Sequence, residues 1–384
     1  MSQVQPNSRD VEKWLKLIRT DGVGPVTFAE LIKHFGSADR VLGASVSELS
    51  KVDGIGLATA DGIAATRDKF DAVAELARAE KLGVWLLTSE DARFPPVLKR
   101  IYDPPPVLYI RGDLTRADSV AISIVGSRMC SYYGCEQSSR FAHLLASSGF
   151  TICSGMARGI DTAAHQGALA AEGRTIAVMG CGLANIFPPE NEKLSEQISE
   201  SGACISELPL SYEPQAKNFP PRNRIIAGLS LGTIVIEAGL RSGALITAKA
   251  ALDYNREVMA VPGKIDSPLS KGTHQLLKEG ARLIDSVEDI MEAIGYIGKQ
   301  LESHVSEAAA KATEKVEMPL FDARDLKLSG DERAVHNHLD KDPKHIEEII
   351  VETALPPGSV NAALISLRLK GLIKQLPGSM FVKS

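Results

Sequence analysis

The sequence is short of aromatic residues and has no excess of positive charge. Aromatic side chains make up 5% of its 384 residues, and the formal net charge is −5 at pH 7. Proteins that coat nucleic acid without specificity carry a strongly basic balance, so that class is excluded for the chain as a whole. A binding site for an anion such as a phosphate must therefore be local.

Cysteines and long apolar runs are scarce as well. The five cysteines form no CxxC pair, which favours neither a zinc site nor a disulfide framework, and we expect all five to be buried small thiols. No stretch approaches the ~20 apolar residues of a membrane span. The polar start MSQVQPNSRD lacks a signal-peptide core, so we expect a cytosolic protein with no membrane partner. The cysteines are Cys130, Cys135, Cys153, Cys181 and Cys204.

The motifs of common nucleotide and metal enzymes are also missing. The sequence contains no GxxxxGK[ST] phosphate loop, no GxGxxG fingerprint and no HExxH zinc motif. Asp161 and His165 stand four residues apart and could form an acid-base pair on one helix face. The simpler interpretation is that Asp161 braces the preceding turn and His165 is packed inside. We therefore predict no catalytic residue, no metal and no cofactor.

Glycine hairpins mark a helical region at the start of the chain. DGVGP at 21–25 and DGIGL at 53–57 form a weak repeat between short amphipathic runs, similar to a tandem helix-hairpin-helix or SAM-like module. Hairpin glycines either let backbone N–H groups approach a phosphate or simply make tight turns, and the sequence leaves both open. We expect this N-terminal all-α domain to span residues 1–82.

Residues 83–295 alternate short β-branched runs with helical segments. Runs such as SVAISIVGS, FTICSG and LGTIVIEAG each lead into a glycine-containing loop, and helices are expected between them, for example over residues 132–148. Strands that are apolar on both faces and separated by helices are typical of a doubly wound, mostly parallel sheet. We predict an α/β, Rossmann-like central domain.

The end of the chain predicts a small separate domain. Residues 296–328 are charged and alanine-rich, and we expect a linker there. Residues 329–384 predict three helices and a terminal β-wing, with Val360, Leu364 and Leu367 on the apolar side of the third helix. This pattern is typical of a winged-helix domain. Because its third helix is only weakly basic, we favour contact with a protein over duplex DNA, without excluding the latter.

Loops that directly follow the strands of the central domain are rich in glycine: GSRMCSYYG, SGMARGIDTAAHQGAL and GCGLANIFPPEN. Ligands of open α/β sheets bind at the carboxyl ends of the strands. Small residues let a backbone approach the ligand, and a helix beginning near Ile160 offers free N–H donors for phosphate. We predict a phosphate-binding crevice whose loops are supported by Gly126, Gly155 and Gly159.

The segment FPPRNRIIAGLS places arginines at a helix start, where the helix dipole is already positive. At about 100° per residue, Arg222 lies in line with the apolar stripe of residues 225–229 and points into the crevice, whereas Arg224 projects elsewhere. The missing counter-charge is either a carboxylate of the chain, Glu207 or Glu237, or an external anion. Further cations in neighbouring loops favour the external anion: Lys217, Arg128, Arg158, Arg241 and Lys249.

Seven ordered blocks over residues 94–284 make the chain similar to the DNA-processing protein A family, also called Smf: IVGSRMCSYYG, SGMARGIDTAAHQGAL, FPPENEKL, SELPL, FPPRNRIIAGLS, VIEAGLRSGALITAKAALDYNREVMAVPG and KGTHQLLKEGARLI. The resemblance implies a Rossmann-like core that binds single-stranded DNA without a nucleotide cofactor. It also implies that the protein protects this DNA in natural transformation and helps to load the recombinase RecA.

The same resemblance assigns the family's functional residues to positions of this chain. The family's dimer contact would fall at His274, Leu277 and Ile284, and a homodimer is expected. Phe219 would be the flat ring on which a base stacks. The DNA-binding residues implied by the matching motifs are Ser127, Arg128, Lys217, Asn218, Phe219, Arg222, Asn223 and Arg224.

An enzyme acting on a nucleotide is the alternative. SLGTIVIEA faintly resembles the PGGxGTxxE loop of phosphoribohydrolases, but the two preceding glycines are absent and Glu237 stands one position too far from Thr233. On an extended chain that offset turns the carboxylate to the opposite side. The sequence therefore favours a non-enzymatic DNA-binding protein.

Overall fold

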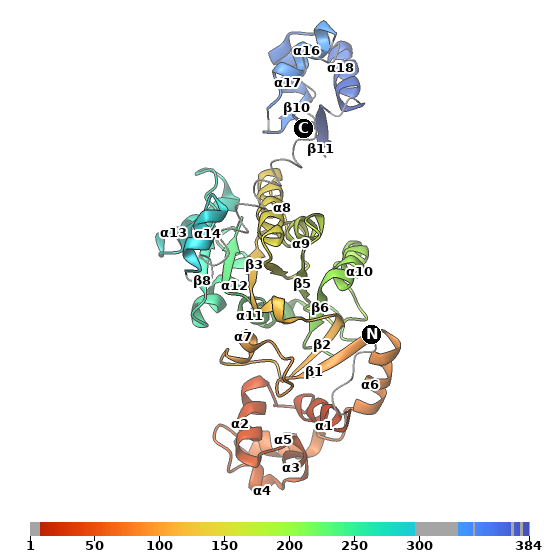
Figure 1. Cartoon of the computed structure of the whole chain (residues 1–384), viewed down its shortest axis with the longest axis vertical. Helices are drawn as coiled ribbons and strands as arrows, with labels where there is room; N and C mark the ends of the chain where they lie inside the picture. The colour runs from red at the N-terminus through yellow and green to blue at the C-terminus, as the bar shows by residue number, and fades with distance from the viewer. Residues whose placement is uncertain (1–7, 296–328, 341, 370–371, 377–378, 384) are drawn as a thin grey trace. The chain divides into compact units, whose positions relative to one another are not determined.

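The computed structural model describes residues 8–295, 329–340, 342–369, 372–376 and 379–383. The chain divides into two compact units at residue 312. The first unit contains the N-terminal helices and a large sheet, and the second contains a small domain of helices and short strands (Figure 1). The linker expected at residues 296–328 lies outside the described residues.

The N-terminal domain is helical, as predicted. α2 and α5 each begin directly after a glycine hairpin, where Gly22 and Gly54 adopt φ angles of 82° and 79° that favour glycine. The apolar faces of these helices share one buried cluster with strand residues such as Leu86 and Tyr109, so the domain is packed against the sheet. Its helices are α1 Ser8–Ile18, α2 Pro25–Phe35, α3 Ala38–Gly43, α4 Val46–Leu49, α5 Leu57–Thr66 and α6 Ala72–Lys81.

The large sheet has the strand order β1-β2-β6-β5-β4-β3-β7-β8-β9. The strands from β3 to β9 are parallel, while β1 and β2 add an antiparallel edge. The predicted mostly parallel sheet is confirmed, although β1, β2 and β9 were not among the predicted strands. The strands are β1 Val84–Thr88, β2 Val107–Gly112, β3 Ala121–Val125, β4 Thr151–Ser154, β5 Thr175–Val178, β6 Ala203–Ser206, β7 Gly232–Val235, β8 Glu257–Ala260 and β9 Arg282–Leu283.

Helices cover both faces of this sheet. α8 and α9 pack on each other and on one face through a cluster that includes Phe141 and Ala164 (Figure 1). α11 and α12 pack on the opposite face, where Ile225 and Ile226 are buried. The longer helices of this region are α8 Tyr132–Ser147, α9 Ile160–Ala170, α10 Glu192–Ser201, α11 Phe219–Leu229, α12 Gly243–Asp253, α13 Lys271–Lys278 and α14 Val287–Ala293.

The chain reverses its direction of winding at β3. β4 lies on one side of β3 and β7 on the other, so the loops after these strands diverge and leave a crevice between them. In doubly wound sheets this switch point, at the carboxyl ends of the strands, is the usual ligand site. The fold therefore places the loop that begins at Gly126 beside the start of α11.

The second unit is a winged-helix domain. Val360, Leu364 and Leu367 form its core together with Ile349, as the sequence pattern predicted. Lys370, the side chain of Ile365 and the turn at 377–378 lie outside the described residues. The elements are α16 Gly330–Asn337, β10 Lys344–His345, α17 Ile346–Thr353, α18 Pro357–Leu369, β11 Ile373–Leu376 and β12 Met380–Lys383, with the sheet order β10-β12-β11.

Within the described part of the chain, no single helix is long and apolar enough to cross a membrane. One bent pair of helices, Ile346–Thr353 with Pro357–Arg368, passes a test of length and composition. Ile349, Val360, Leu364 and Leu367 of this pair pack into the core of the winged-helix domain.

Candidate nucleic-acid interface

An open pocket of about 770 Å³ lies at the carboxyl edge of the large sheet, next to the end of β3. Its walls come from the segments that follow β3, β4, β5, β6 and β7, together with the starts of α11 and α12. The predicted crevice is therefore present at the predicted edge. Of the residues singled out from the sequence, it brings together Gly126, Ser127, Arg128, Asp161, Phe219, Arg222, Asn223 and Arg241.

Arg222 forms the buried wall of this pocket. Arg222 is only 5% exposed to solvent. Nη1 donates to the carbonyl oxygens of Gly155, at 2.8 Å, and Val178, while Nε donates to Asn223 Oδ1 at 3.2 Å. These acceptors orient the guanidinium without neutralising it. Burial lowers the pKa of Arg222, and the nearby Asp161 carboxylate opposes this effect.

Neither of the two carboxylates suggested from the sequence, Glu207 and Glu237, pairs with Arg222. Within the described residues, no carboxylate forms an ion-pair contact with this guanidinium. Glu237 instead accepts hydrogen bonds from Ser131 N at 2.8 Å and Ser131 Oγ at 2.5 Å, and so closes the start of α8. Glu207 pairs with the other arginine of the segment. Arg222 therefore keeps a positive charge at the pocket wall.

Arg224 points to the opposite side of α11 and is fully engaged. Nη2 donates to the Glu207 carboxylate, Nη1 donates to Asp103 O at 2.8 Å, and Nε lies 3.4 Å from Asp103 Oδ2. Positions two apart on a helix face different directions, which explains why its neighbour reaches the pocket and Arg224 does not. The hypothesis that both arginines await an external anion is therefore wrong for Arg224, which anchors α11 instead.

Phe219 lines the pocket close to two cations. The Arg128 guanidinium carbon is 5.2 Å from the ring centroid, and that of Arg222 is 5.7 Å from it. Phe187 packs at a centroid distance of 5.8 Å and an interplanar angle of 50°. Guanidinium groups are attracted to aromatic faces, so these contacts hold the ring and both charges together. Arg128 itself is exposed.

The start of α11 offers side-chain rather than backbone donors. Pro220 and Pro221 have no N–H, so two of the usual free donors of a helix start are missing. Asn218, at the N-cap, instead contributes a buried Nδ2 that has no hydrogen-bond partner among the described residues. Lys217 precedes it in a short 3₁₀ turn and is exposed. Neither Asn218 nor Lys217 is among the residues that line the pocket, although Ala216 and Phe219 on either side of them are.

The loop after β4 supports the pocket, and N–H groups of this loop are hydrogen-bonded within the protein. Ile160 N donates to Ser127 O at 3.2 Å, and Asp161 Oδ2 accepts from Gly155 N at 3.1 Å. The N–H groups of Ile160 and Thr162 are therefore bonded to backbone carbonyls, so the expectation that they are free for phosphate is wrong. Gly159 has a φ of 76°, and a Cβ there would lie 2.5 Å from Ser127 O, so only glycine allows the two loops to touch.

Asp161 and His165 are structural, as the simpler interpretation held. Asp161 braces the turn before α9, and burial raises the pKa of its carboxyl to about 6. His165 Nδ1 lies 2.7 Å from Thr175 Oγ1, and burial lowers the pKa of the ring to about 3. The two side chains contact different partners and do not form an acid-base pair.

Cys130 and Cys135 correct another expectation. They form a disulfide, with Cα atoms 6.4 Å apart, because α8 begins between them and turns the second back toward the first. Cys153, Cys181 and Cys204 are buried free thiols, as predicted. The disulfide lies two residues after Arg128 and fixes the end of that pocket loop to α8.

Three family models match this chain in order. A model described as DNA recombination-mediator protein A matches residues 85–295, which include the whole pocket. The DprA-like N-terminal HHH domain matches residues 8–63, and the DprA winged helix domain matches residues 321–379. The chain belongs to the DNA recombination-mediator protein A family.

Relatives of this family resemble the chain over most of its length. The protein Smf of Synechocystis is 34% identical over 96% of this chain and 97% of its own length. The DNA processing protein DprA of Bacillus subtilis is 40% identical over 57% of this chain and 74% of its own length.

Two solved structures of family members share the fold. The DNA processing protein A of Streptococcus pneumoniae has a TM-score of 0.64 and 33% identity, covering 75% of this chain and 98% of its own. The DNA processing protein A of Helicobacter pylori has a TM-score of 0.50 and 30% identity, covering 56% of this chain and 96% of its own. The structural study of the latter concerns its single-stranded DNA binding mode.

The residues expected at the family's dimer contact have different environments in this chain. Ile284 is 0% exposed inside the core, so its expected part in a subunit contact is wrong. Leu277 is partly buried, and His274 Nε2 lies 3.1 Å from Gly263 O. The exposed apolar residue here is Leu283, at 49%, on the edge strand β9.

Some pocket residues were not predicted from the sequence, and several of the predicted cations do not line the pocket. Phe187, Met129 and Ile246 line the pocket but were not singled out. Phe187 could have been noticed, because it stands in the third of the loops that follow strands. Conversely, Arg158 pairs with Glu190, and Lys249 lies on α12 outside the pocket lining.

Proposed function

We propose that this chain binds single-stranded DNA in the pocket, without a nucleotide cofactor and without catalysis. Arg128, Arg222 and Lys217 contact backbone phosphates, and one base stacks on Phe219. Ser127, Asn218 and Asn223 supply further hydrogen bonds. The observation that carries the proposal is the Phe219 ring in the lining of an open pocket, with the guanidinium carbons of Arg128 and Arg222 at 5.2 and 5.7 Å from its centroid.

The shape of the site favours a single strand over a duplex. The stacking ring is half-buried in a recess, where only a base that has left its stack can reach it. A duplex keeps its bases stacked and would meet only the exposed cations at the rim. The study of the Helicobacter pylori relative, which concerns single-stranded DNA binding, supports the same choice.

We further propose a role in recombination for this binding. The bound strand is protected during natural transformation and is handed to the recombinase RecA, with the chain acting as a homodimer. The family description as a recombination mediator supports this role. The exposed edge strand β9 with Leu283, next to His274 and Leu277, is the surface that we propose for the dimer.

The pocket does not favour the alternative of a nucleotide-processing enzyme. Glu237 is 5% exposed and committed to the start of α8, away from the pocket lining. The stretch GLSLG at 228–232 has the GxSxG spacing of a nucleophile elbow. However, Ser230 follows a helix rather than a strand, is 0% exposed and donates to Ile226 O at 3.0 Å.

A titration of labelled oligonucleotides tests the proposal. Equal lengths of single- and double-stranded DNA are bound by fluorescence anisotropy at two salt concentrations without added nucleotide. We expect tighter binding of the single strand and a log–log salt slope of about −0.7 for each phosphate contacted. Equal affinity for both forms would contradict the proposal. Release of free base from nucleoside monophosphates would instead support the enzyme.

A further inference from the structure

The N-terminal helical domain contacts the segment that leads to the DNA-binding residues. Arg19, just after α1, donates through Nη2 to the carbonyl oxygen of Glu207. Glu75, on α6, accepts from the backbone N–H of Leu210 at 2.7 Å. Both contacts hold the chain directly after β6, in the 207–212 segment. The same chain continues through residues 213–216 to Lys217 and Phe219.

We call the contacts of Arg19 and Glu75 with residues 207–212 the joint. Glu207 connects this joint to α11, the helix that carries Arg222. Its carbonyl accepts from the helical domain, while its carboxylate accepts from Arg224 of α11. Arg224 also bonds Asp103, and Tyr254 donates its OH to the same aspartate. Since the neighbouring Arg222 reaches the pocket from the other side of α11, the pairing at Glu207 sets the rotation of the helix and the direction of Arg222.

The remaining contacts of the segment leave its second half dependent on the first. The loop after β5 holds the first half through three hydrogen bonds: Leu210 O accepts from Ala184 N at 2.9 Å, Tyr212 O accepts from Gly182 N at 2.8 Å, and Ser211 O accepts from Asn185 Nδ2 at 2.9 Å. Beyond these, residues 213–217 are exposed. The position of Lys217 is thus determined from the two ends of the segment, by the joint at 207–212 and by α11 at Phe219.

The joint combines apolar packing with directed polar contacts. The Arg19 guanidinium carbon lies 6.0 Å from the ring centroid of Tyr109. Arg19 Nε and Tyr109 OH are buried and have no hydrogen-bond partner among the described residues. Unsatisfied buried groups weaken a contact. The joint also contains Leu210, which is buried in the apolar cluster of the helical domain, and the hydrogen bonds that join Arg19 to Glu207 and Leu210 to Glu75 fix the position of the segment.

We propose that Arg19 and Glu75 are positioning residues for the single-strand pocket, through which the N-terminal helical domain holds the 207–219 segment in its binding position. The inference rests on the proposed function. It gives the helical domain a part in binding at the pocket that needs no contact between this domain and DNA. Loosening the joint lets the segment move and displaces Lys217 from the phosphate path.

The test is a double-mutant cycle on the full-length chain. Affinity for a single-stranded oligonucleotide is measured for Arg19→Ala, Lys217→Ala and the double variant. We expect Arg19→Ala to weaken binding roughly three- to tenfold, and to weaken it much less once Lys217 is absent, as for residues that act on one element. Glu75→Ala should show the same pattern, and it replaces Arg19→Ala in the cycle if Arg19→Ala does not fold. Arg19→Lys, which keeps a donor, should restore part of the affinity.

Arg93→Ala is the matched control. Arg93 is another arginine that lies over an aromatic ring, with its guanidinium carbon 5.2 Å from the Trp85 centroid, but it contacts Asp91 rather than the 207–219 segment. Its loss should leave DNA affinity unchanged. Wild-type affinity in Arg19→Ala and Glu75→Ala, or equal losses with and without Lys217, would overturn the inference alone. Failure of the unmodified chain to bind single strands would overturn the proposed function and the inference with it.

Discussion

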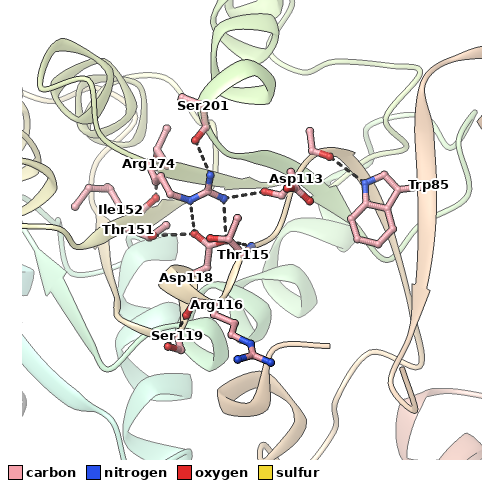
Figure 2. A network of polar contacts seen from close by, with 12 residues as sticks. Trp85, Asp113, Thr115, Arg116, Asp118, Ser119, Thr151, Ile152, Arg174 and Ser201 are labelled. Atoms are coloured by element: carbon pink, nitrogen blue, oxygen red, sulfur yellow. Dashed lines mark hydrogen bonds and ion pairs between the residues drawn. The ribbon is translucent and has the colours of Figure 1, made fainter. Parts of the chain in front are cut away.

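Two arginine sites at opposite ends of the same parallel strands are built in opposite ways. Arg174 precedes β5 at the amino end of the strands, and the chain satisfies it completely (Figure 2). Nε and Nη2 each lie 2.9 Å from an oxygen of Asp118, while Nη1 and Nη2 donate to Ser201 O and Asp113 O at 3.0 and 2.8 Å. Asp118 is 2% exposed and also accepts from Thr151.

Arg222 at the carboxyl end receives only carbonyl and amide acceptors and faces an open pocket. The comparison teaches that the partners of an arginine, rather than its burial, separate a structural site from a binding site. A guanidinium with its own carboxylate stabilises the fold. One that is oriented by uncharged acceptors keeps its charge for a ligand.

The largest expected effect comes from breaking the ion pair between Arg174 and Asp118. Asp118→Ala leaves Arg174 without its carboxylate and should lower the free energy of unfolding by about 3 kcal/mol, as for other broken buried pairs. Urea denaturation measures this change. The affinity of the folded variant for single-stranded DNA should remain that of the unmodified chain. Arg116→Ala is the control, since its exposed side chain lies beside the network without joining it (Figure 2).

Arg128→Ala should have the opposite effect: it should weaken DNA binding and leave folding stability unchanged. Arg128 is exposed, so the urea midpoint should not move, whereas loss of one charge-assisted phosphate contact should weaken single-strand binding by about 1.5–3 kcal/mol. The salt slope should become less steep by about 0.7. Arg158→Ala removes an equally exposed arginine that is paired with Glu190, and it should bind as the unmodified chain does. Equal affinities of the two variants would remove Arg128 from the pocket.

Phe219→Ala tests stacking apart from charge. Loss of the ring should cost about 1–3 kcal/mol of binding free energy for every base sequence, with the salt slope unchanged. Phe219→Leu keeps apolar volume without a flat face and should recover folding stability but little affinity. A salt slope that fell with the ring would show that Phe219 acts by placing the arginines instead.

The smallest effect concerns pH. Since the pKa of Asp161 is raised from 3.8 to about 6, the folded protein holds a proton that the unfolded chain releases, and stability from this group falls as pH rises through that window. Protonation also removes a negative charge near Arg222, so single-strand affinity should increase between pH 7.5 and 5.5, by about 1 kcal/mol or less. Asp161→Asn should lose this pH dependence, and an unchanged pH profile in the variant would contradict it.

Much of the fold and part of the site could be predicted from local patterns. The helix expected over 132–148 is α8 at Tyr132–Ser147, because capping and apolar period are properties of nearby residues. The same helical periodicity directed Arg222 into the crevice and Arg224 away from it. The partner of Arg224, the burial of Ile284 and the pairing of Cys130 with Cys135 were not predicted, since each depends on how the chain folds back on itself.

The sequence alone determined six strands of the parallel core and several of the helices between them, and it placed the loops after those strands at one edge, because periodicity and glycine placement act locally. Only the tertiary structure decided which charges remain unpaired. Glu207 and Asp103 reach Arg224 across long stretches of chain, while no carboxylate among the described residues reaches the Arg222 guanidinium. Ion pairing depends on distances of a few ångströms between distant segments, and sequence spacing does not contain those distances.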